Sequence, residues 1–406
     1  MSALQKTIMK NKLPPKCPKT SEVSKLAPFG ASRRKDYHPV SWKQYFERYV
    51  DVDIEGGTFR VYLTAEPDHT ERPRIITLHG GGYSGLSWAI FAEEITNMIH
   101  CQVISMDIRG HGETKAHNND DLSAETLVKD VEEVLHKLFG DILPPLILVG
   151  HSMGGAIAVR TAHLPSLEQS IQGIAVIDVV EGTAMDALAS MQSFLRGRPT
   201  HFKSIEHAIE WCVRSGQVRN VDSAKVSMAS QIVNCETGRL ATSEVETYCS
   251  EQQGEGEGEG EFGGGCGTAN VTLRPDAIDE DAELQFTGPA PVGDSAAMKY
   301  KWRIDLSKTE RHWSGWFKGL SAAFLSVRAP RLLLLASIDG LDRELTVGQM
   351  QGKFQMQVLA RCGHAVHEDT PGEVARVIAS FALRHRLTSP TENGEQMNLV
   401  SGPPGC

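Results

Sequence analysis

The sequence predicts an α/β fold in which a mostly parallel sheet is covered by helices on both faces and carries a helical insertion. The first observation is a series of short, continuously apolar runs, such as Leu332-Leu333-Leu334-Leu335. Runs of this kind are typical of strands that are buried on both faces of a parallel sheet. The second observation is that amphipathic helical patterns separate most of these runs, which is the chain order of βα units.

The individual elements follow from these patterns. Strands are expected at residues 74–78, 101–106, 146–149, 173–177, 332–335 and 354–359. Ser123 is expected as the N-cap of a helix whose apolar residues recur at helical spacing. A small-residue helix follows the glycine-rich turn at residues 150–155. The last helix is predicted to open with a capping box of Thr370 and Glu373, with Pro371 in its first turn.

A long insertion interrupts the alternation. Residues 182–325 are predicted to form a cap above the sheet, with helices around residues 182–232 and 300–325. Within the insertion, residues 250–298 are of low complexity and begin with Glu-Gly repeats. We expect a disordered acidic loop there, because such a composition cannot bury enough apolar surface to offset its ordering entropy. The remaining segments are the α/β core at residues 39–181 and 326–386, a disordered basic N-terminal tail at 1–38 and a C-terminal tail at 387–406.

Composition excludes several classes of protein. The 406 residues are 40% hydrophobic and 23% charged, close to the average for globular proteins. The formal net charge of -10 argues against nucleic acid or an anionic membrane as the main partner. No apolar run is long enough for a signal peptide or a membrane helix, and the eight cysteines form no CxxC pair. We therefore expect reduced thiols in a cytoplasmic and/or nuclear protein.

The strongest chemical signal is the pentapeptide Gly150-His151-Ser152-Met153-Gly154. It matches G-x-S-x-G and lies between an apolar strand and a helix, where a sharp turn exposes a nucleophilic serine at a helix N-terminus. The alternative is a glycine-rich loop that only packs a helix closely against the sheet. The position between strand and helix favours Ser152 as the nucleophile of an α/β-hydrolase fold.

An oxyanion hole is predicted from a second glycine-rich turn. His79-Gly80-Gly81-Gly82 directly follows the expected strand at residues 74–78. Acyl transfer needs two pre-aimed N–H donors: one from the residue after the nucleophile, Met153, and one from this loop, from Gly81 or Gly82. A phosphate-binding turn is the alternative, but neither G-x-G-x-x-G nor a Walker pattern is present.

The general base is expected after the last strand. Two histidines, His364 and His367, lie between that strand and the final helix. We favour His364, because it follows a glycine just beyond the strand, in the part of the loop that the fold exposes. His367 lies nearer to the start of the helix and is expected to support the loop.

Position alone leaves the orienting acid open. Asp178 ends the strand after the nucleophile helix, whereas Asp339 and Asp342 follow the Leu332–Leu335 strand. All three belong to the C-terminal edge of the sheet, where ligand sites lie, and position in the fold slightly favours the later pair. The segment from residue 107 to residue 112 follows another strand, and we interpret it as structural.

Long stretches of the chain are similar to the protein phosphatase methylesterases. These serine hydrolases remove the methyl ester from the C-terminal leucine of the protein phosphatase 2A catalytic subunit. The stretch Val179-Val180-Glu181-Gly182-Thr183-Ala184-Met185-Asp186 resembles this family in particular, and not α/β hydrolases in general. The resemblance runs from about Asp36 to the C-terminus, apart from residues 235–298. It rests on residues 79–82, 86–88, 150–157, 177–198, 318–320, 346–358 and 363–369.

The resemblance implies Ser152, Asp178 and His364 as the catalytic triad, which favours Asp178 over the later acids. It also implies that the insertion forms part of the docking surface for the phosphatase, that the chain binds and holds inactive phosphatase, and that members are largely nuclear. Relatives can carry a basic cluster in the acidic insertion. This chain departs from that pattern, because its only comparable basic run is Arg33-Arg34-Lys35.

The expected function is a serine carboxylesterase that demethylates the phosphatase tail through an acyl-enzyme, without a metal or organic cofactor. A generic carboxylesterase or lipase is one alternative, and it would have a broad apolar pocket. A protein that inactivates the phosphatase by occupancy, with hydrolysis secondary, is another. An epoxide hydrolase or dehalogenase would need aspartate at the nucleophile position, and Ser152 excludes the usual form.

Overall fold

The structure is a computed structural model that describes residues 36–254, 298–337, 341–397 and 399. Tyr37–Cys406 forms one compact unit, distinct from Met1–Asp36, and the description below concerns this larger unit. Most of the predicted basic tail at residues 1–38 and of the predicted acidic loop at 250–298 lies outside the described residues.

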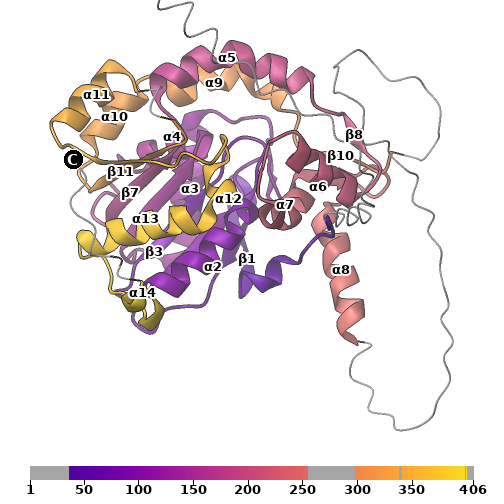
Figure 1. Cartoon of the computed structure of the whole chain (residues 1–406), viewed down its shortest axis with the longest axis horizontal. Helices are drawn as coiled ribbons and strands as arrows, with labels where there is room; N and C mark the ends of the chain where they lie inside the picture. Colours follow the sequence, from indigo (N-terminus) through magenta and orange to yellow (C-terminus); the bar gives the residue numbers. More distant parts are fainter. Residues whose placement is uncertain (1–35, 255–297, 338–340, 398, 400–406) are drawn as a thin grey trace, which may run out of the picture. The chain divides into compact units, whose positions relative to one another are not determined.

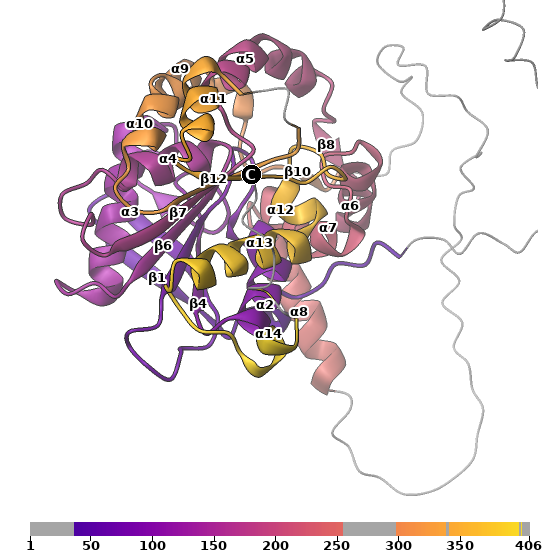
Figure 2. The same cartoon turned by 60° about the vertical axis from the view of Figure 1, so that its left-hand side comes forward.

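The core is a nine-stranded sheet in the order β1-β2-β4-β3-β6-β7-β11-β12, with β5 paired to β2. Figures 1 and 2 show this sheet at the centre of the unit. Every pairing from β4 to β12 is parallel, whereas β2 runs antiparallel to β1, β4 and β5. The predicted α/β class with a mostly parallel sheet is therefore confirmed. The strands are β1 (Arg48–Ile54), β2 (Gly57–Leu63), β3 (Arg74–Leu78), β4 (Gln102–Met106), β5 (Lys115–Ala116), β6 (Leu146–His151), β7 (Ile171–Ile177), β11 (Arg331–Leu335) and β12 (Gln355–Val358).

Helices cover both faces of the sheet, as the continuous apolar runs predict. Successive strand residues alternate between two hydrophobic clusters. Ile147 belongs to the cluster that contains α2 and α13, and its neighbour Leu148 belongs to the cluster with α3 and α4. The central strands β3, β4 and β6 are buried along their whole length, whereas the edge strand β1 exposes most of its residues. The covering helices are α2 (Ala89–Met98), α3 (Ala124–Phe139), α4 (Met153–Thr161), α13 (Pro371–Arg384) and the short α14 (Glu392–Gln396), which contacts α2.

Capping was predicted correctly at one helix and wrongly at another. The Ser123 hydroxyl accepts a hydrogen bond from the N–H of Thr126 and caps α3, as expected. Thr370 precedes α13, but its hydroxyl donates to the carbonyl of Val366, and its side chain makes no capping bond. The predicted capping box with Glu373 is therefore wrong. The physical reason is that the short helix α12 (Val366–Asp369) ends directly before Thr370 and supplies another hydrogen-bond acceptor.

The insertion contains a second small sheet that the sequence did not predict. Its three strands, in the order β8-β10-β9, come from segments far apart in the chain. Tyr300–Trp302 was expected to be helical, but it forms β10 and pairs with Phe202 on one side and Asn234 on the other. The strands are β8 (His201–Phe202), β9 (Ile232–Asn234) and β10 (Tyr300–Trp302).

The rest of the insertion is mainly helical. Helix α8 continues to Gly254, so the first residues of the predicted loop at 250–298 are helical instead. The helices are α5 (Glu181–Arg196), α6 (Ile205–Arg214), α7 (Val221–Ser227), α8 (Ala241–Gly254), α9 (Glu310–Phe317) and α10 (Leu320–Ser326), and α11 (Arg343–Met350) follows β11. Short 3₁₀ helices are η1 (Trp42–Gln44), η2 (Gly85–Trp88), η3 (Met228–Gln231) and η4 (Leu306–Thr309).

Candidate active site

Ser152 lies in a sharp turn between β6 and α4. Its backbone has φ 53° and ψ -120°, in a region that residues with a side chain seldom adopt. Two close backbone approaches explain the flanking glycines. A Cβ on Gly150 would lie 2.3 Å from the carbonyl oxygen of Gly154, and a Cβ on Gly154 would lie 2.2 Å from that of Leu78. The turn therefore has the strained strand-to-helix geometry that exposes a nucleophile.

The helix after this turn begins earlier than the sequence suggested. Helix α4 starts at Met153 and not at Ala156, so Ser152 is its N-cap residue. The N–H of Ser152 donates to the carbonyl of Ile177 at 3.0 Å, which ties the turn to the end of β7. The N–H groups at the start of a helix point outward and favour negative charge. Ser152 is thus held where an oxyanion would be stabilised.

His364 and Asp178 form a hydrogen-bonded pair at the same edge of the sheet. Nδ1 of His364 lies 2.8 Å from Oδ2 of Asp178. The other carboxylate oxygen, Oδ1, accepts a hydrogen bond from the N–H of Ala336 at 3.0 Å. Burial favours a raised pKa for Asp178, but the hydrogen bonds from His364 and Ala336 outweigh it and hold the pKa below its ordinary value. An ionised Asp178 fixes the proton on Nδ1 and leaves Nε2 of His364 to act as a base.

The backbone of Asp178 is constrained as well. Its φ of 51° is positive, although it is not glycine. Its N–H donates to the carbonyl of Leu334 at 2.8 Å, so the residue bridges the ends of β7 and β11. With this backbone conformation and this hydrogen bond, the Asp178 carboxylate reaches the loop that carries His364.

His151 links the histidine loop to the nucleophile turn, a role that the sequence analysis missed. Nε2 of His151 lies 2.8 Å from the carbonyl oxygen of His364, and the two rings are 4.8 Å apart. Since a carbonyl only accepts, Nε2 of His151 must carry the proton. Burial strongly lowers the pKa of His151, so its ring is neutral. In the described part of the chain, no hydrogen bond joins Ser152 to His364, and the hydrogen bond from the His151 ring to the His364 carbonyl connects their two segments.

The other candidates occupy different positions. Oδ1 of Asp342 accepts a hydrogen bond from the N–H of Leu345 at 2.9 Å and caps α11, while its Oδ2 accepts one from the Ser321 hydroxyl. Asp339 lies outside the described residues. His367 is fully buried, with its ring 4.2 Å from that of Trp88. Of the predicted acids that are described, Asp178 is the one that contacts His364.

The glycine loop after β3 places its two candidate N–H donors in different environments. The N–H of Gly82 donates to Nε2 of His111 at 2.9 Å, so it is already engaged. Gly81 adjoins the nucleophile turn, because a Cβ placed on it would lie 4.0 Å from Sδ of Met153. Gly82 itself has φ 83°, and a Cβ there would come within 2.7 Å of Leu306. The geometry therefore favours Gly81 over Gly82 as a donor to an oxyanion.

Two buried histidines hold this loop against the segment at residues 107–112. Nε2 of His79 accepts a hydrogen bond from the N–H of Ile108 at 3.0 Å, and Nδ1 of His79 donates to the carbonyl of Gly80. His111 accepts from Gly82 in the same way. Burial lowers the pKa of His111 to about 4 and that of His79 well below its ordinary value. Both rings are therefore neutral at neutral pH and can accept these bonds.

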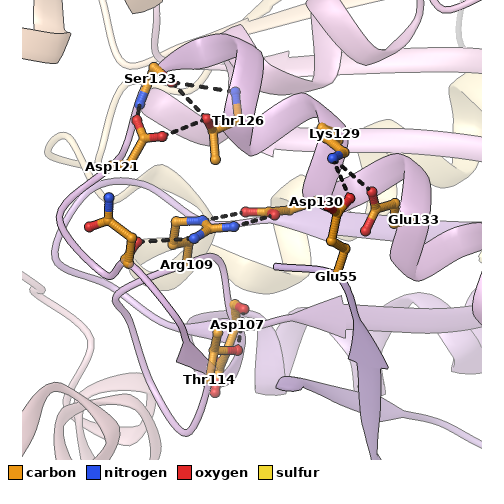
Figure 3. A network of polar contacts seen from close by, with 11 residues as sticks. Glu55, Asp107, Arg109, Thr114, Asp121, Ser123, Thr126, Lys129, Asp130 and Glu133 are labelled. Atoms are coloured by element: carbon orange, nitrogen blue, oxygen red, sulfur yellow. Dashed lines mark hydrogen bonds and ion pairs between the residues drawn. The ribbon is translucent and has the colours of Figure 1, made fainter. Parts of the chain in front are cut away.

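The segment at residues 107–112 is also an internal support, as Figure 3 shows. The guanidinium of Arg109 forms a bidentate pair with Asp130 on α3, with nitrogen–oxygen distances of 2.6 and 2.7 Å. Oδ1 of Asp107 accepts a hydrogen bond from the N–H of Gly85 at 2.7 Å. These contacts anchor the loop beneath the candidate site.

The histidine loop is fastened to the insertion. Oδ1 of Asp369 accepts a hydrogen bond from the N–H of Arg219, and Oδ2 accepts one from the N–H of Gly363, both at 2.6 Å. The Ser227 hydroxyl donates to buried Glu368 at 2.6 Å. The sequence carried no signal for the links to Arg219 and Ser227, because these two residues are far from the histidine loop in the chain. They fix both ends of the segment that carries His364.

A serine at a helix N-terminus, at the same sheet edge as a histidine whose Nδ1 is held by a carboxylate, is the arrangement that acyl transfer requires.

Within the described ranges, no group of three or more His, Cys, Asp or Glu side chains could hold a metal ion. Nor is any helix in those ranges both long and apolar enough to cross a membrane.

Comparison with known proteins agrees with this geometry. A family model for the alpha/beta hydrolase fold matches residues 73–371. Protein phosphatase methylesterase 1 of Bos taurus is 49% identical over 401 residues, which cover 96% of this chain and 99% of the bovine protein. The probable protein phosphatase methylesterase 1 of Caenorhabditis elegans is 38% identical over 96% of this chain and 86% of its own length. A solved E-2-(acetamidomethylene)succinate hydrolase, 16% identical, superimposes with a TM-score of 0.55 over 82% of this chain and 98% of its own, which shows a shared fold.

Proposed function

The chain belongs to the protein phosphatase methylesterase family of α/β hydrolases, and we propose that it removes the methyl ester from the C-terminal leucine of the protein phosphatase 2A catalytic subunit. That it is a carboxylic ester hydrolase follows from the family. The single observation that carries the assignment of its machinery is the His364–Asp178 hydrogen bond at the sheet edge that also holds the Ser152 turn.

In the proposed first half-reaction, the Ser152 hydroxyl attacks the carbonyl carbon of the methyl ester. Nε2 of His364 accepts the hydroxyl proton, and Asp178 stabilises the imidazolium through Nδ1. The tetrahedral intermediate collapses, its C–O bond to the methoxy group breaks, and His364 gives the proton to the departing methoxy oxygen, which leaves as methanol. The terminal acyl group remains on Ser152. The missing Ser152–His364 hydrogen bond forms when substrate enters, as catalytic contacts are often longer in free enzymes.

In the second half-reaction, His364 takes a proton from water as the water attacks the acyl-enzyme. Collapse of the second tetrahedral intermediate breaks the bond to Ser152, whose oxygen takes the proton back from His364, and releases the carboxylic acid, which loses its own proton to water and becomes the free carboxylate. The N–H groups of Met153 and Gly81 stabilise both oxyanions. Gly82 shapes the loop through its positive φ and its hydrogen bond to His111. The chemistry uses neither a metal nor an organic cofactor.

The surface around the candidate site, which includes the insertion, is proposed to bind the phosphatase and to hold its inactive form. The insertion is the part of the chain that is packed against the histidine loop, through Arg219 and Ser227, which supports a docking role near the site. Residence in the cytoplasm or nucleus stays a prediction.

Carboxymethylated phosphatase 2A catalytic subunit tests the proposal. Wild-type protein should remove the methyl ester, and the Ser152→Ala variant should bind the phosphatase with unchanged affinity but leave the ester intact. A protein that acts only by occupancy would show binding by both forms and demethylation by neither. That outcome would overturn the esterase assignment.

A generic carboxylesterase is distinguished by substrate size. Docking energy from the folded phosphatase can position the ester, so kcat/KM should be much higher for the intact subunit than for a short methylated tail peptide. Equal values for the two substrates would favour the generic esterase.

A further inference from the structure

We propose that a pocket beside the glycine loop binds an acidic side chain of the protein tail that carries the ester, and that Arg198 recognises its carboxylate. The inference rests on the proposed function and adds a substrate preference to it. Arg198 is the last residue of the family-like stretch at 177–198, and the mechanism above gives it no role.

The pocket lies at the edge of the insertion, between the C-terminal end of α5, β8, β10 and η4. Figure 1 shows β8 and β10 next to each other, with the end of α5 leading toward them. Its volume is about 580 Å³, and its walls include Arg198, Trp302 and Leu306. This volume accommodates several side chains of an extended peptide.

Arg198 is held in place by two tryptophans. Its guanidinium carbon lies 3.6 Å from the ring centroid of Trp302 and 6.0 Å from that of Trp211. The indole N–H of Trp302 donates to the carbonyl of Pro199 at 2.7 Å, which fixes the ring against which Arg198 stacks. A guanidinium covered on its face keeps its edge N–H groups for a planar acceptor, and a carboxylate matches that geometry.

In the described part of the chain, no carboxylate forms an ion pair with the guanidinium of Arg198. Its Nε is buried without a hydrogen-bond partner. Burial lowers the pKa of Arg198 to about 10, which leaves it charged at neutral pH. A partly desolvated cation without a partner is unfavourable, and an incoming carboxylate would relieve that penalty.

Other charges around the pocket favour an anion. Arg196 and Lys301 also line it. The two acids that line it are engaged: Asp305 accepts hydrogen bonds from the backbone and hydroxyl of Ser307, and Glu310 accepts one from the Gln192 side chain. These neutral donors leave both acids charged, but the lining carries three cations, Arg196, Arg198 and Lys301, against two anions, so its net charge is positive in a chain whose net charge is -10.

Leu306 connects this pocket to the glycine loop of the candidate active site. Leu306 lines the pocket, and it also contacts the glycine loop, where a Cβ on Gly81 would lie 3.7 Å from it. An extended peptide advances about 3.3 Å per residue. The recognised carboxylate should therefore belong to a residue within a few positions of the esterified C-terminus.

Peptide methyl esters test the proposal on the full chain. A fluorescent peptide ending in leucine methyl ester, with aspartate at one of the three to five preceding positions, is compared with the peptide carrying asparagine there. Binding is measured by anisotropy with the Ser152→Ala protein, so that the result does not depend on turnover. We expect at least one position at which aspartate binds about tenfold more tightly, as one charge-assisted contact allows.

Adding Arg198→Gln should reduce that preference to less than twofold. Arg214→Gln is the matched control, because Arg214 is an exposed cation of the same insertion whose partner is Glu210, and the tenfold preference should persist. If Arg198→Gln does not fold, Arg198→Lys keeps the charge without the planar fork and should reduce the preference to about threefold. A tenfold preference that persists with either replacement, or no preference at any position in the Ser152→Ala protein, would overturn the proposal.

Two further arms separate the remaining outcomes. A phosphoserine peptide that binds more tightly than the aspartate peptide would overturn the assignment to a carboxylate. Methanol release from the same peptides by the wild-type protein reports on the proposed function alone. Loss of the aspartate preference with normal methanol release would reject the pocket, whereas an intact preference without methanol release would reject the esterase.

Discussion

Nδ1 of His364 lies 2.8 Å from Oδ2 of Asp178, although 186 positions separate the two residues in the chain. The contact forms because β7 and β11 are neighbours in the sheet. Asp178 follows β7, and the loop that carries His364 follows β12, the next strand beyond β11. The order of the strands therefore decides which acid orients the histidine.

Replacing Asp178 should abolish most activity. Asp178→Asn keeps the shape of the side chain but favours the wrong tautomer of His364. The corresponding change in a serine protease lowers kcat about 10⁴-fold, and we expect a loss on that scale. Asp342→Asn is the control. It weakens the cap of α11 and the hydrogen bond from the Ser321 hydroxyl, neither of which involves His364, and should lower kcat less than about tenfold. Comparable losses at both positions, measured as kcat on a methyl ester substrate, would return the acid to the later strand.

His151 should affect turnover more than binding. His151→Phe keeps a planar ring but removes the N–H that donates to the His364 carbonyl, and one such bond contributes about 1–3 kcal/mol when its partner stays buried. We expect kcat to fall about tenfold to a hundredfold with KM nearly unchanged. His151→Gln retains an N–H donor and should recover part of the loss. If both variants kept wild-type kcat, His151 would have no positioning role.

Removing one partner of the buried Arg109–Asp130 ion pair should destabilise the fold strongly. Arg109 and Asp130 are both buried, and burial raises the pKa of Asp130 in spite of the guanidinium beside it. Removing one partner leaves an uncompensated charge, so Asp130→Ala should lower the free energy of unfolding by about 3–5 kcal/mol. Glu55→Ala breaks the exposed pair with Lys129 seen in Figure 3 and should leave the urea midpoint nearly unchanged. Equal effects would contradict this account.

Acid should destabilise the protein through its buried histidines. Burial lowers the pKa values of four of them, so the unfolded chain binds four protons below pH 6.5 that the folded chain does not: His79, His111, His151 and His367. Two acids act in the opposite sense. Burial raises the pKa of Asp107 to about 7 and strongly raises that of Glu368, so the folded chain keeps two protons that the unfolded chain releases.

A third acid, Asp130, also has a pKa that burial raises, whereas burial lowers the pKa values of the partly buried His207 and His385 as well. The histidines with lowered pKa values therefore outnumber the acids with raised ones, and the free energy of unfolding should fall between about pH 6 and pH 5. Urea titrations at the two pH values measure it. Replacing the exposed His69 with glutamine should leave the slope unchanged. A protein that gains stability on acidification over this interval would contradict the assignment of neutral buried histidines.

Local signals in the sequence were sufficient for the parallel strands of the sheet and for the serine turn, but β1, β2 and β5 were not predicted. Both-face burial produces continuous apolar strands, and close backbone contacts demand Gly150 and Gly154 whatever the rest of the chain does. The fold class was therefore predictable. Strand β10 was not, because Tyr300–Trp302 becomes a strand only by pairing with two segments far away in the chain.

The candidate site also contains some residues that the sequence could identify and others that it could not. Ser152 and His364 could be named from their positions after strands. Three acids followed strands at the same sheet edge, and spacing alone did not separate Asp178 from Asp342. The roles of His151 and His111 depend on contacts between loops that meet only in the folded chain. Sequence periodicity carries no information about such contacts.

Methanol released from carboxymethylated phosphatase 2A catalytic subunit tests the central claim most directly. The wild-type chain and a Ser326→Ala control, which changes an exposed serine at the end of α10, should each release one methanol per methylated subunit over many turnovers. Ser152→Ala should release essentially none, since loss of a triad nucleophile lowers kcat by several orders of magnitude. Methanol release by Ser152→Ala at the wild-type rate would contradict the account.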